Sequence, residues 1–284
     1  MPDTTIADRP VIGFVGLGDQ GAPLAQAIAD AGFPLHAWAR RPASLAALDG
    51  RPYSAHETLA DLARAVDVVA LCLREDSDIL ELVEQQGLLE HMRPGSVLVN
   101  HGTGLPATAH RLQKLAGPSG IHIVDAPVSG GHAVAVAREL TTIAGGDDAA
   151  LRLVTPVFES FSKQVIHVGP AGAGQYGKLF NNAVMMMNHK NLLDALAVAR
   201  ALDLPLAPLL DVLRSGSAAS FALSAFGPSI TAQNADHLRE LELIDMDLFA
   251  AATAGNAGEE RDTVVARAAA GARGLPELTR MTGN

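Results

Sequence analysis

Val11-Ile-Gly-Phe-Val-Gly16-Leu-Gly18-Asp-Gln-Gly21 is the stretch of sequence that decides the fold. A short apolar run, typical of a buried strand, is followed by the spacing GxGxxG, and residues 23–31 then have the pattern of a helix that stops at Gly32. In this order the first glycine permits a tight turn, the second lets the backbone approach a pyrophosphate, and the third lets helix and strand pack closely. The free N–H groups at the start of the helix then face the anion. The stretch predicts a dinucleotide-binding βαβ unit, whereas the same glycines without this context would indicate only a glycine-rich turn.

The alternation of short apolar runs and amphipathic stretches continues to about residue 168. After the first strand at residues 11–15, we expect strands at residues 35–39, 66–73, 97–100, 121–126, 140–144 and 165–168, because these runs are mostly β-branched and bounded by glycine, proline or polar residues. Ser54-Ala-His-Glu57 fits a capping box that would open a helix running to Arg64. The alternation predicts an α/β fold with a mainly parallel, doubly wound sheet and helices on both faces.

The pattern changes after residue 168. Gly169-Pro-Ala-Gly172-Ala-Gly174 is a cluster of structure-breaking residues, and no later run has the pattern of a strand. Residues 175–202 can form one long helix, and residues 207–214, 244–254, 263–273 and 276–281 also have helical patterns. We therefore predict a Rossmann-type domain in residues 1–170 and an all-α domain in residues 171–284, joined by the long helix.

Composition narrows the range of functions. The 284 residues are 48% hydrophobic and carry a formal net charge of −10, which argues against disorder and against a nucleic-acid-binding surface. The single cysteine, Cys72, excludes an internal disulfide and a multi-cysteine metal site, and no spacing such as HExxH occurs, so no metal is expected. There is no apolar run of about 18 residues and no signal-peptide pattern, so we expect a cytoplasmic protein without a membrane segment.

The end of the second expected strand bears on the choice of dinucleotide. An NAD site usually places an acidic residue there to bind the ribose 2′-hydroxyl, but this chain has Trp38-Ala-Arg40-Arg41-Pro42. Two guanidinium groups suit the 2′-phosphate of NADP, because they can form charge-assisted hydrogen bonds with it. The alternative is that both arginines are solvated surface residues. We expect NADP (NADPH) in preference to NAD.

Two further motifs could build a substrate site. Asp125-Ala-Pro-Val-Ser129-Gly130-Gly131 offers clustered backbone N–H groups and a hydroxyl that can bind a carboxylate, and otherwise is a tight loop that needs glycine. Lys178 lies near the start of the long helix, where the helix dipole disfavours a cation, and Asn182 follows one turn later on the same face. A lysine beside a nicotinamide can act as general acid or base. The alternative is an ordinary surface lysine at a helix end.

Together these motifs resemble the β-hydroxyacid dehydrogenase family, whose members include 3-hydroxyisobutyrate dehydrogenase and tartronate semialdehyde reductase, with the larger 6-phosphogluconate dehydrogenase as a relative. The resemblance covers almost the whole chain: residues 13–21 look like the cofactor turn, 38–42 like the strand end of NADP-preferring members, 125–131 like the substrate-binding signature, and 172–182 like the catalytic block. It implies reversible hydride transfer between a nicotinamide and a small 3-hydroxyacid or its aldehyde or keto partner. It also implies a homodimer or larger homo-oligomer.

The resemblance implies roles for individual residues. Lys178 would exchange a proton with the substrate oxygen, and Asn182 would hydrogen-bond near that oxygen. The run Ser129-Gly130-Gly131 would hold the substrate carboxylate. His132 and Asp247 are further candidates for substrate contact, with a solvated histidine and a surface carboxylate as the alternatives. The expected cofactor contacts are Gly16, Leu17, Gly18, Asp19, Gln20, Gly21, Arg40, Arg41, Leu73 and Thr103.

The chain departs from the family pattern at several positions. Asn100 and Gly102 replace an acidic residue and a serine of a family loop, Val134 and Arg138 stand where glycines usually follow the substrate-binding signature, and Met246 replaces the lysine of a late Lys-Asp-Leu block. These changes leave the fold and hydride transfer intact but open the site to a bulkier or less acidic substrate. An imine reductase and a non-catalytic NADP-binding module are the alternatives. Lys178, in place of the Asp or Tyr common in imine reductases, argues against the first, and the pair of Lys178 and Asn182 argues against the second.

Overall fold

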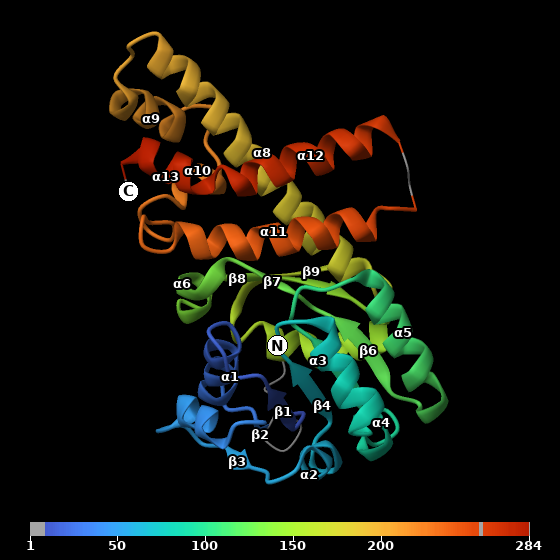
Figure 1. The fold of residues 1–284 in the computed structure, drawn as a ribbon. Coiled ribbons are helices and arrows are strands. Elements are labelled where there is room, and N and C mark those ends of the chain that lie inside the picture. The colour runs from blue at the N-terminus through green and yellow to red at the C-terminus, as the bar shows by residue number, and fades with distance from the viewer. Residues whose placement is uncertain (1–8, 256–257, 284) are drawn as a thin grey trace. The chain divides into compact units, whose positions relative to one another are not determined.

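The computed structural model describes residues 9–255 and 258–283 (Figure 1). The chain divides into two compact units, which we call the sheet unit and the helical unit, between Lys178 and Leu179, inside the long helix α8 (Ala173–Ala201). The boundary expected from the sequence, at residue 170, lies in the glycine cluster that precedes this helix. No helix within the described ranges is long and apolar enough to cross a membrane.

The sheet unit is built on a nine-stranded sheet with the order β3-β2-β1-β4-β5-β6-β8-β7, and β9 pairs with β8. Strands β1 to β6 run parallel along this order, β8 is antiparallel to β6 and β7, and β9 is parallel to β8. The central β1 lies between β2 and β4, so the strand order reverses there and a crevice is expected at its carboxyl end. The strands are β1 (Ile12–Val15), β2 (Leu35–Trp38), β3 (Ser54–Ala55), β4 (Val68–Leu71), β5 (Val97–Asn100), β6 (His122–Asp125), β7 (Val128–Ser129), β8 (Leu140–Gly145) and β9 (Ser162–Gly169).

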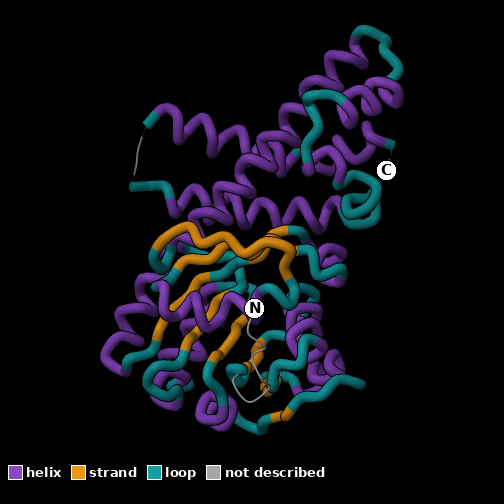
Figure 2. The backbone as a smooth tube through the Cα atoms, turned by 180° about the vertical axis from the view of Figure 1, so that it is seen from behind, coloured by secondary structure: helices purple, strands orange, loops and turns teal. Residues whose placement is uncertain are grey.

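Side chains alternate between the two faces of this sheet. Ile12 and Phe14 of β1 lie in one hydrophobic cluster, together with α1 (Gly21–Asp30) and α7 (Asp148–Phe158), whereas Val15 lies in another. The second cluster includes α2 (Leu59–Ala65), α4 (Leu88–His91) and α5 (Pro106–Ala116). Helices therefore cover both faces (Figure 2), which confirms the predicted doubly wound α/β fold. The remaining short elements of this unit are η2 (Pro42–Leu48), α3 (Asp76–Leu80), η3 (Glu81–Gln85), η4 (Gly117–Ser119) and α6 (Gly131–Val136).

One predicted helix start is wrong. Ser54 and Ala55 form the edge strand β3 beside β2 instead of a capping box, and α2 begins at Leu59. The N-cap is Thr58, whose Oγ1 accepts a hydrogen bond from the backbone N–H of Asp61 at 3.1 Å. The sequence holds two consecutive signals of the form Ser/Thr-x-x-acid, at residues 54–57 and 58–61, and the first belongs to the sheet edge.

The helical unit contains α-helices and no strand among its described residues, 179–255 and 258–283. In this unit α12 packs closely against α8 at Gly271. A Cβ atom at this position would lie only 1.8 Å from the carbonyl oxygen of Met186, so the contact requires glycine. α11 begins at Ala235 and not at residue 244, and its first half was not predicted because it is rich in charged residues. Besides the main part of α8, the helices are α9 (Leu206–Ser215), α10 (Phe221–Ser224), α11 (Ala235–Ala252), α12 (Glu259–Arg273) and α13 (Leu275–Thr282).

Candidate functional site

The GxGxxG turn joins β1 to α1 at the carboxyl edge of the sheet. Gly16 has a φ of +98°, and a Cβ atom there would lie 2.2 Å from the carbonyl oxygen of Cys72. A Cβ atom at Gly21 would lie 1.8 Å from the carbonyl oxygen of Gly16, so α1 can start directly against the turn only with glycine at this position. Gly18 differs, because a Cβ atom there would meet nothing within 4 Å. Packing inside the chain does not require this glycine, which leaves the backbone open to a ligand.

A pocket lies beside this turn. Its wall combines the turn itself with Trp38 and the residues that follow β2, and with Asp78 and Leu82 from the segment after β4. The Nε2 atom of Gln20, the residue before α1, is buried and has no hydrogen-bond partner in the described ranges. Gln20 does not line the pocket, and the fit to an anionic dinucleotide rests on the open second glycine and the two arginines. Six of the ten expected cofactor contacts line the pocket, namely Gly16, Leu17, Gly18, Arg40, Arg41 and Leu73.

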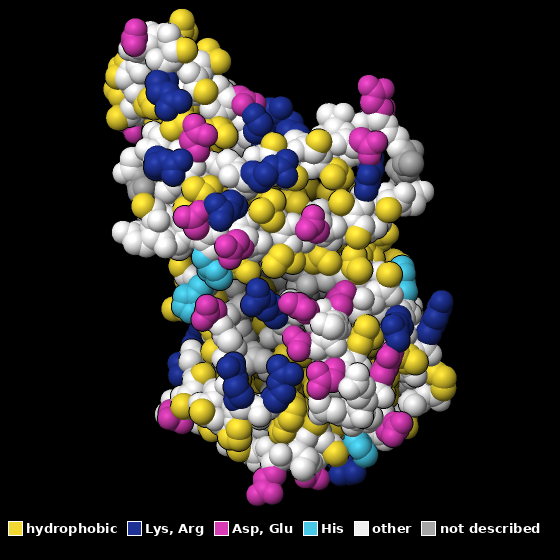
Figure 3. All heavy atoms as spheres, in the orientation of Figure 1, with side chains coloured by type: hydrophobic (Ala, Val, Ile, Leu, Met, Phe, Trp, Pro, Cys, Tyr) yellow, Lys and Arg dark blue, Asp and Glu magenta, His cyan; other side chains and the backbone are white. Residues whose placement is uncertain are grey.

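Arg40 is the more closely accompanied of the two arginines. Its Nη1 lies 3.7 Å from Oδ1 of Asp78, on α3, and 3.7 Å from Oε2 of Glu81, on η3. Both distances are too long for hydrogen bonds, and the Arg40 side chain is 69% exposed. The two contacts are therefore ion pairs without hydrogen-bond geometry. Figure 3 shows basic and acidic side chains next to one another on this face of the sheet unit. Neither carboxylate was predicted as part of the site, because both come from a different segment of the chain.

The expected substrate loop lies next to the cofactor turn. Ser129 ends β7, and Gly130 and Gly131 have φ values of +140° and +76°, which explains the two glycines. His132, in the first turn of α6, places Nδ1 2.7 Å from the carbonyl oxygen of Asp19, so its N–H donates to the cofactor turn. Two motifs that lie far apart in the sequence are thereby joined by one imidazole ring.

Val134 and Arg138 replace family glycines, and Val134 lies against the loop itself, since a Cβ atom at Gly130 would lie 2.7 Å from Cγ1 of Val134. Val134 is partly buried and packs against the hydrophobic cluster around β1. Arg138 has a φ of +60°, in the left-handed region that glycine adopts most easily. Its guanidinium pairs with Asp30 at 2.5 Å, and this ion pair ties the end of α6 to α1. The arginine therefore keeps a glycine-like backbone and adds an ion pair.

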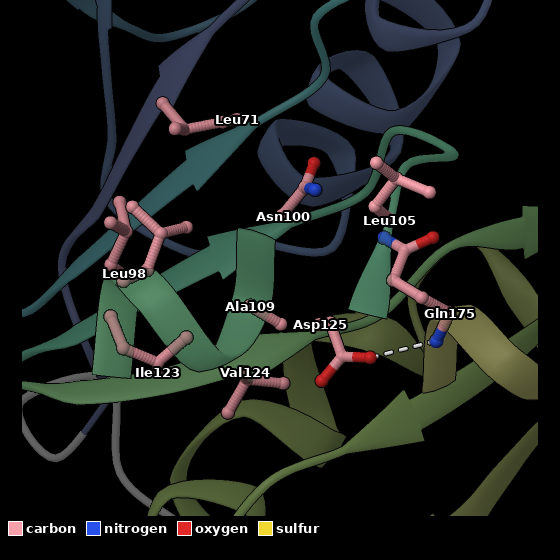
Figure 4. Close-up of a pocket in the computed structure, with 10 residues that line it drawn as sticks. Leu71, Leu98, Asn100, Leu105, Ala109, Ile123, Val124, Asp125 and Gln175 are labelled. Carbon is pink, nitrogen blue, oxygen red and sulfur yellow. Dashed lines mark hydrogen bonds between the residues drawn. The ribbon is translucent and has the colours of Figure 1, made fainter. Parts of the chain in front are cut away.

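Asp125, the last residue of β6, holds the start of α8. Its side chain is buried, with Oδ1 accepting the N–H of Gly172 at 2.6 Å and Oδ2 accepting the N–H of Gln175 at 2.7 Å. Figure 4 shows the carboxylate beside Gln175 in a small pocket at the carboxyl ends of β4, β5 and β6. Burial raises the pKa of Asp125 to about 6, although the backbone hydrogen bonds favour its charged form. A carboxylate here also complements the dipole of the helix.

The side chain of Gln175 connects this helix start to the loop after β5. Its Oε1 accepts the N–H of Gly104 at 2.9 Å, and its Nε2 donates to the carbonyl oxygen of Gly102 at 2.8 Å. Thr103, an expected cofactor contact, lies between these two glycines. A Cβ atom at Gly102 would lie 2.6 Å from the carbonyl oxygen of Leu73, so the close approach of the two loops explains glycine here. Gln175 and Asp125 stood in the quoted motifs, but their role depends on contacts that spacing does not reveal.

Lys178 lies early in α8, directly after the point where the helix touches the sheet. A Cβ atom at Gly177 would lie 2.7 Å from Cγ2 of Ile143 on β8, so the helix packs there without an intervening side chain. Asn182 follows one turn later on the same helix. The division between the two units falls between Lys178 and Asn182.

Asn182 is hydrogen-bonded within the helical unit. Its Nδ2 donates to Oδ2 of Asp245 on α11 at 2.5 Å, and its Oδ1 accepts from Nδ2 of Asn181 at 3.0 Å. Asp247, the acidic residue that the sequence analysis favoured, is exposed two residues further along. Met246, where the family has lysine, is buried in a hydrophobic cluster with α8 and α12. No group of three His, Cys, Asp or Glu side chains suited to a metal ion occurs in residues 9–255 and 258–283.

Comparison with known proteins extends this picture. Residues 11–169 match the family model of the NAD binding domain of 6-phosphogluconate dehydrogenase, and residues 172–272 match a model described as NAD-binding of NADP-dependent 3-hydroxyisobutyrate dehydrogenase. The NAD-dependent L-serine dehydrogenase of Pseudomonas aeruginosa is 33% identical over 76% of this chain and 73% of its own length. The 2-(hydroxymethyl)glutarate dehydrogenase of Eubacterium barkeri is 32% identical over 75% of this chain and 71% of its own length.

The fold also matches solved structures. A 3-hydroxyisobutyrate dehydrogenase of Mycobacterium tuberculosis, solved with L-serine, has a TM-score of 0.80 over 97% of this chain and 98% of its own, at 24% identity. This likeness confirms the architecture of a Rossmann-like sheet followed by helices.

Proposed function

The chain belongs to the β-hydroxyacid dehydrogenase family of NAD(P)-binding oxidoreductases, and from that premise we propose that it transfers a hydride between NADP and a small 3-hydroxyacid. The observation that carries the proposal lies within the sheet unit, where the Ser129–Gly131 loop adjoins the dinucleotide turn through the hydrogen bond from His132 to Asp19. The substrates in the names of the relatives support the substrate class. L-Serine, 2-(hydroxymethyl)glutarate and 3-hydroxyisobutyrate each carry a primary alcohol on the carbon β to a carboxylate.

In this proposal each motif has one task. A nicotinamide held at the glycine turn would supply hydride transfer to or from the carbon that carries the hydroxyl group. Lys178 takes the hydroxyl proton during oxidation and gives it back during reduction, and Asn182 hydrogen-bonds near the same oxygen. The hydroxyl of Ser129 and the N–H groups of Gly130 and Gly131 hold the carboxylate, which orients the reacting carbon. His132 and Asp247 are further proposed contacts with the substrate, Asp247 with a group other than its carboxylate.

The start of α8 supports this assignment for Lys178. The carboxylate of Asp125 and the side chain of Gln175 connect this turn of the helix to β6 and to the loop that carries Thr103. A catalytic group needs a fixed position relative to its cofactor, and these buried hydrogen bonds restrict the movement of the helix from which Lys178 projects.

The preference for NADP over NAD is the second part of the proposal. Arg40 and Arg41 line the pocket beside the glycine turn, and β2 ends without an acidic residue. We expect the double variant Arg40→Ala/Arg41→Ala to lose about 10-fold or more in kcat/KM for NADP and little for NAD. Equal kcat/KM for the two cofactors in the parent protein would contradict this part.

The overall test is a spectrophotometric screen of NADP reduction with 3-hydroxyacids and of NADPH oxidation with aldehydes, keto acids and cyclic imines. We expect turnover of a 3-hydroxyacid that falls by about 100-fold or more in Lys178→Ala, with NADPH binding retained. Turnover of imines alone would favour an imine reductase, and NADPH binding without any turnover would favour a non-catalytic module.

We also propose a cytoplasmic homodimer or larger homo-oligomer. Exposed apolar side chains of the helical unit, such as Val198, Leu202 and Val212, are consistent with a covered surface. Light scattering tests this, since a monomer at working concentration would contradict it.

A further inference from the structure

Arg40 stands between two carboxylates at the wall of the dinucleotide pocket. Nη1 of Arg40 is equidistant from Asp78 and Glu81, at 3.7 Å, and both carboxylates are about one-third exposed. Asp78 itself lines the pocket together with Arg40 and Arg41. Arg41 forms no ion pair with any residue in the described ranges. A ligand phosphate would therefore compete with carboxylates for Arg40 but not for Arg41.

The local charge balance bears on which dinucleotide the pocket accepts. Two carboxylates neutralise the guanidinium of Arg40 and leave an excess of one negative charge beside it. The phosphate that distinguishes NADP from NAD carries a charge of about −1.5 to −2. It is therefore attracted by Arg40 and Arg41 but repelled by Asp78 and Glu81, whereas the uncharged 2′-hydroxyl of NAD is nearly indifferent to all four.

The geometry allows Arg40 to change partners. At 3.7 Å the contacts to Asp78 and Glu81 are too long for hydrogen bonds. A 2′-phosphate could form shorter, charge-assisted hydrogen bonds with the same guanidinium. Binding of NADP would then release two carboxylates from their partner, and this release opposes binding.

We propose that Asp78 and Glu81 determine cofactor selectivity by competing with the 2′-phosphate for Arg40. Their presence reduces the ratio of NADP affinity to NAD affinity. The site therefore discriminates less between the two cofactors than two arginines alone would predict. The inference rests on the proposed function insofar as Arg40 is taken to bind the 2′-phosphate.

The experiment measures the dissociation constants of NADP and NAD for the full chain through the fluorescence of Trp38, which lines the pocket and is the single tryptophan. Asp78→Asn and Glu81→Gln should each tighten NADP binding by about 3-fold, and the double variant by about 10-fold, with NAD changed by less than about 2-fold. The gain should shrink at high salt, because these charges are partly exposed. In an Arg40→Ala background the same substitutions should produce no gain.

A matched control is Glu84→Gln. Glu84 lies on the same short helix as Glu81 but pairs with Arg111 at 2.6 Å, away from the pocket wall. This variant removes one negative charge from the same segment and should leave both dissociation constants unchanged.

The outcomes distinguish a failure of the proposed role of Arg40 from a failure of the proposed competition. If Arg40→Ala leaves NADP affinity unchanged, the proposed role of Arg40 is wrong. If Arg40→Ala weakens NADP binding but Asp78→Asn and Glu81→Gln do not strengthen it, the competition is refuted while the NADP preference stands. A gain that persists without Arg40, or that is equal for NAD, also refutes the competition.

Discussion

Replacing His101 with leucine should make the sheet unit less sensitive to acid. The imidazole is 3% exposed, and its Nδ1 lies 2.9 Å from the carbonyl oxygen of Ala126. Its Nε2 is buried without a partner in the described ranges, and the ring packs edge-on against Phe158 and Phe161. Burial lowers the pKa of His101 to about 4 from its ordinary value of 6.5. The hydrogen bond to the carbonyl oxygen of Ala126 favours the charged ring, but the effect of burial is larger.

The sign and size of the effect follow from that pKa. Because the folded protein holds the neutral ring, the stabilising contribution is fully present above pH 6.5 and is lost as the pH falls towards 4. Between pH 7 and pH 5 the loss is about 2 kcal/mol in the free energy of unfolding. Asp125 acts in the opposite direction, since its raised pKa means that protonation on acidification stabilises the fold. The parent protein alone would therefore show a mixture of the two effects.

The comparison of parent and variant at each pH removes the contribution of Asp125. Urea unfolding followed by the fluorescence of Trp38 reports on the unit that contains His101. The stability of His101→Leu relative to the parent should rise by about 2 kcal/mol between pH 7 and pH 5. A constant difference for His101→Leu would refute the reasoning.

Three further predictions concern packing, capping and the start of α8. Gly271→Ala should destabilise the helical unit by about 2 kcal/mol or more, because the new methyl group would overlap the carbonyl oxygen of Met186; thermal unfolding should show no such loss for Gly255→Ala, where a Cβ atom has open space. Asp147→Ala should cost about 1 kcal/mol in urea unfolding, since Asp147 caps α7 through two backbone N–H groups, and Asp147→Asn should keep most of that stability. Asp125→Asn should lower kcat by about 10-fold or more with little change in the affinity for NADPH, because one acceptor oxygen facing the start of α8 becomes a donor; an unchanged kcat in steady-state assays would contradict the positioning role.

The sequence predicts the sheet unit well where strands are buried on both faces. Such strands are continuous apolar runs bounded by breakers. All seven expected strands are present within a few residues of their predicted positions, including β9, which is largely exposed. Two strands of two residues each, β3 and β7, were missed, because each pairs with a single neighbour, β2 for β3 and β8 for β7, and both residues of β3 are exposed. For the same reason a capping-box pattern at Ser54 was misleading, since local signals cannot show that the same residues will pair with a sheet edge.

The candidate site was predictable as motifs and unpredictable as contacts. Glycine spacing indicates the tight turn and the close contact between helix and strand at Gly16 and Gly21, and at Gly18 a backbone that is open to a ligand. The partners of Arg40 and the two ends of the Gln175 amide come from segments that meet only in the folded chain. No periodicity or spacing in one segment carries information about a side chain supplied by another.

The buried carboxylate of Asp125 has a consequence for the order in which the molecule assembles. Its two N–H donors come from residues that follow it by 47 and 50 positions, so they leave the ribosome after β6 is complete. Until they arrive, the carboxylate must stay in contact with water, because an ionised group cannot enter the interior without partners. Docking of α8 and dehydration of Asp125 are therefore a single event. The strands of the nascent sheet unit can pair early, but Asp125 becomes buried only after the start of the long helix has been synthesised.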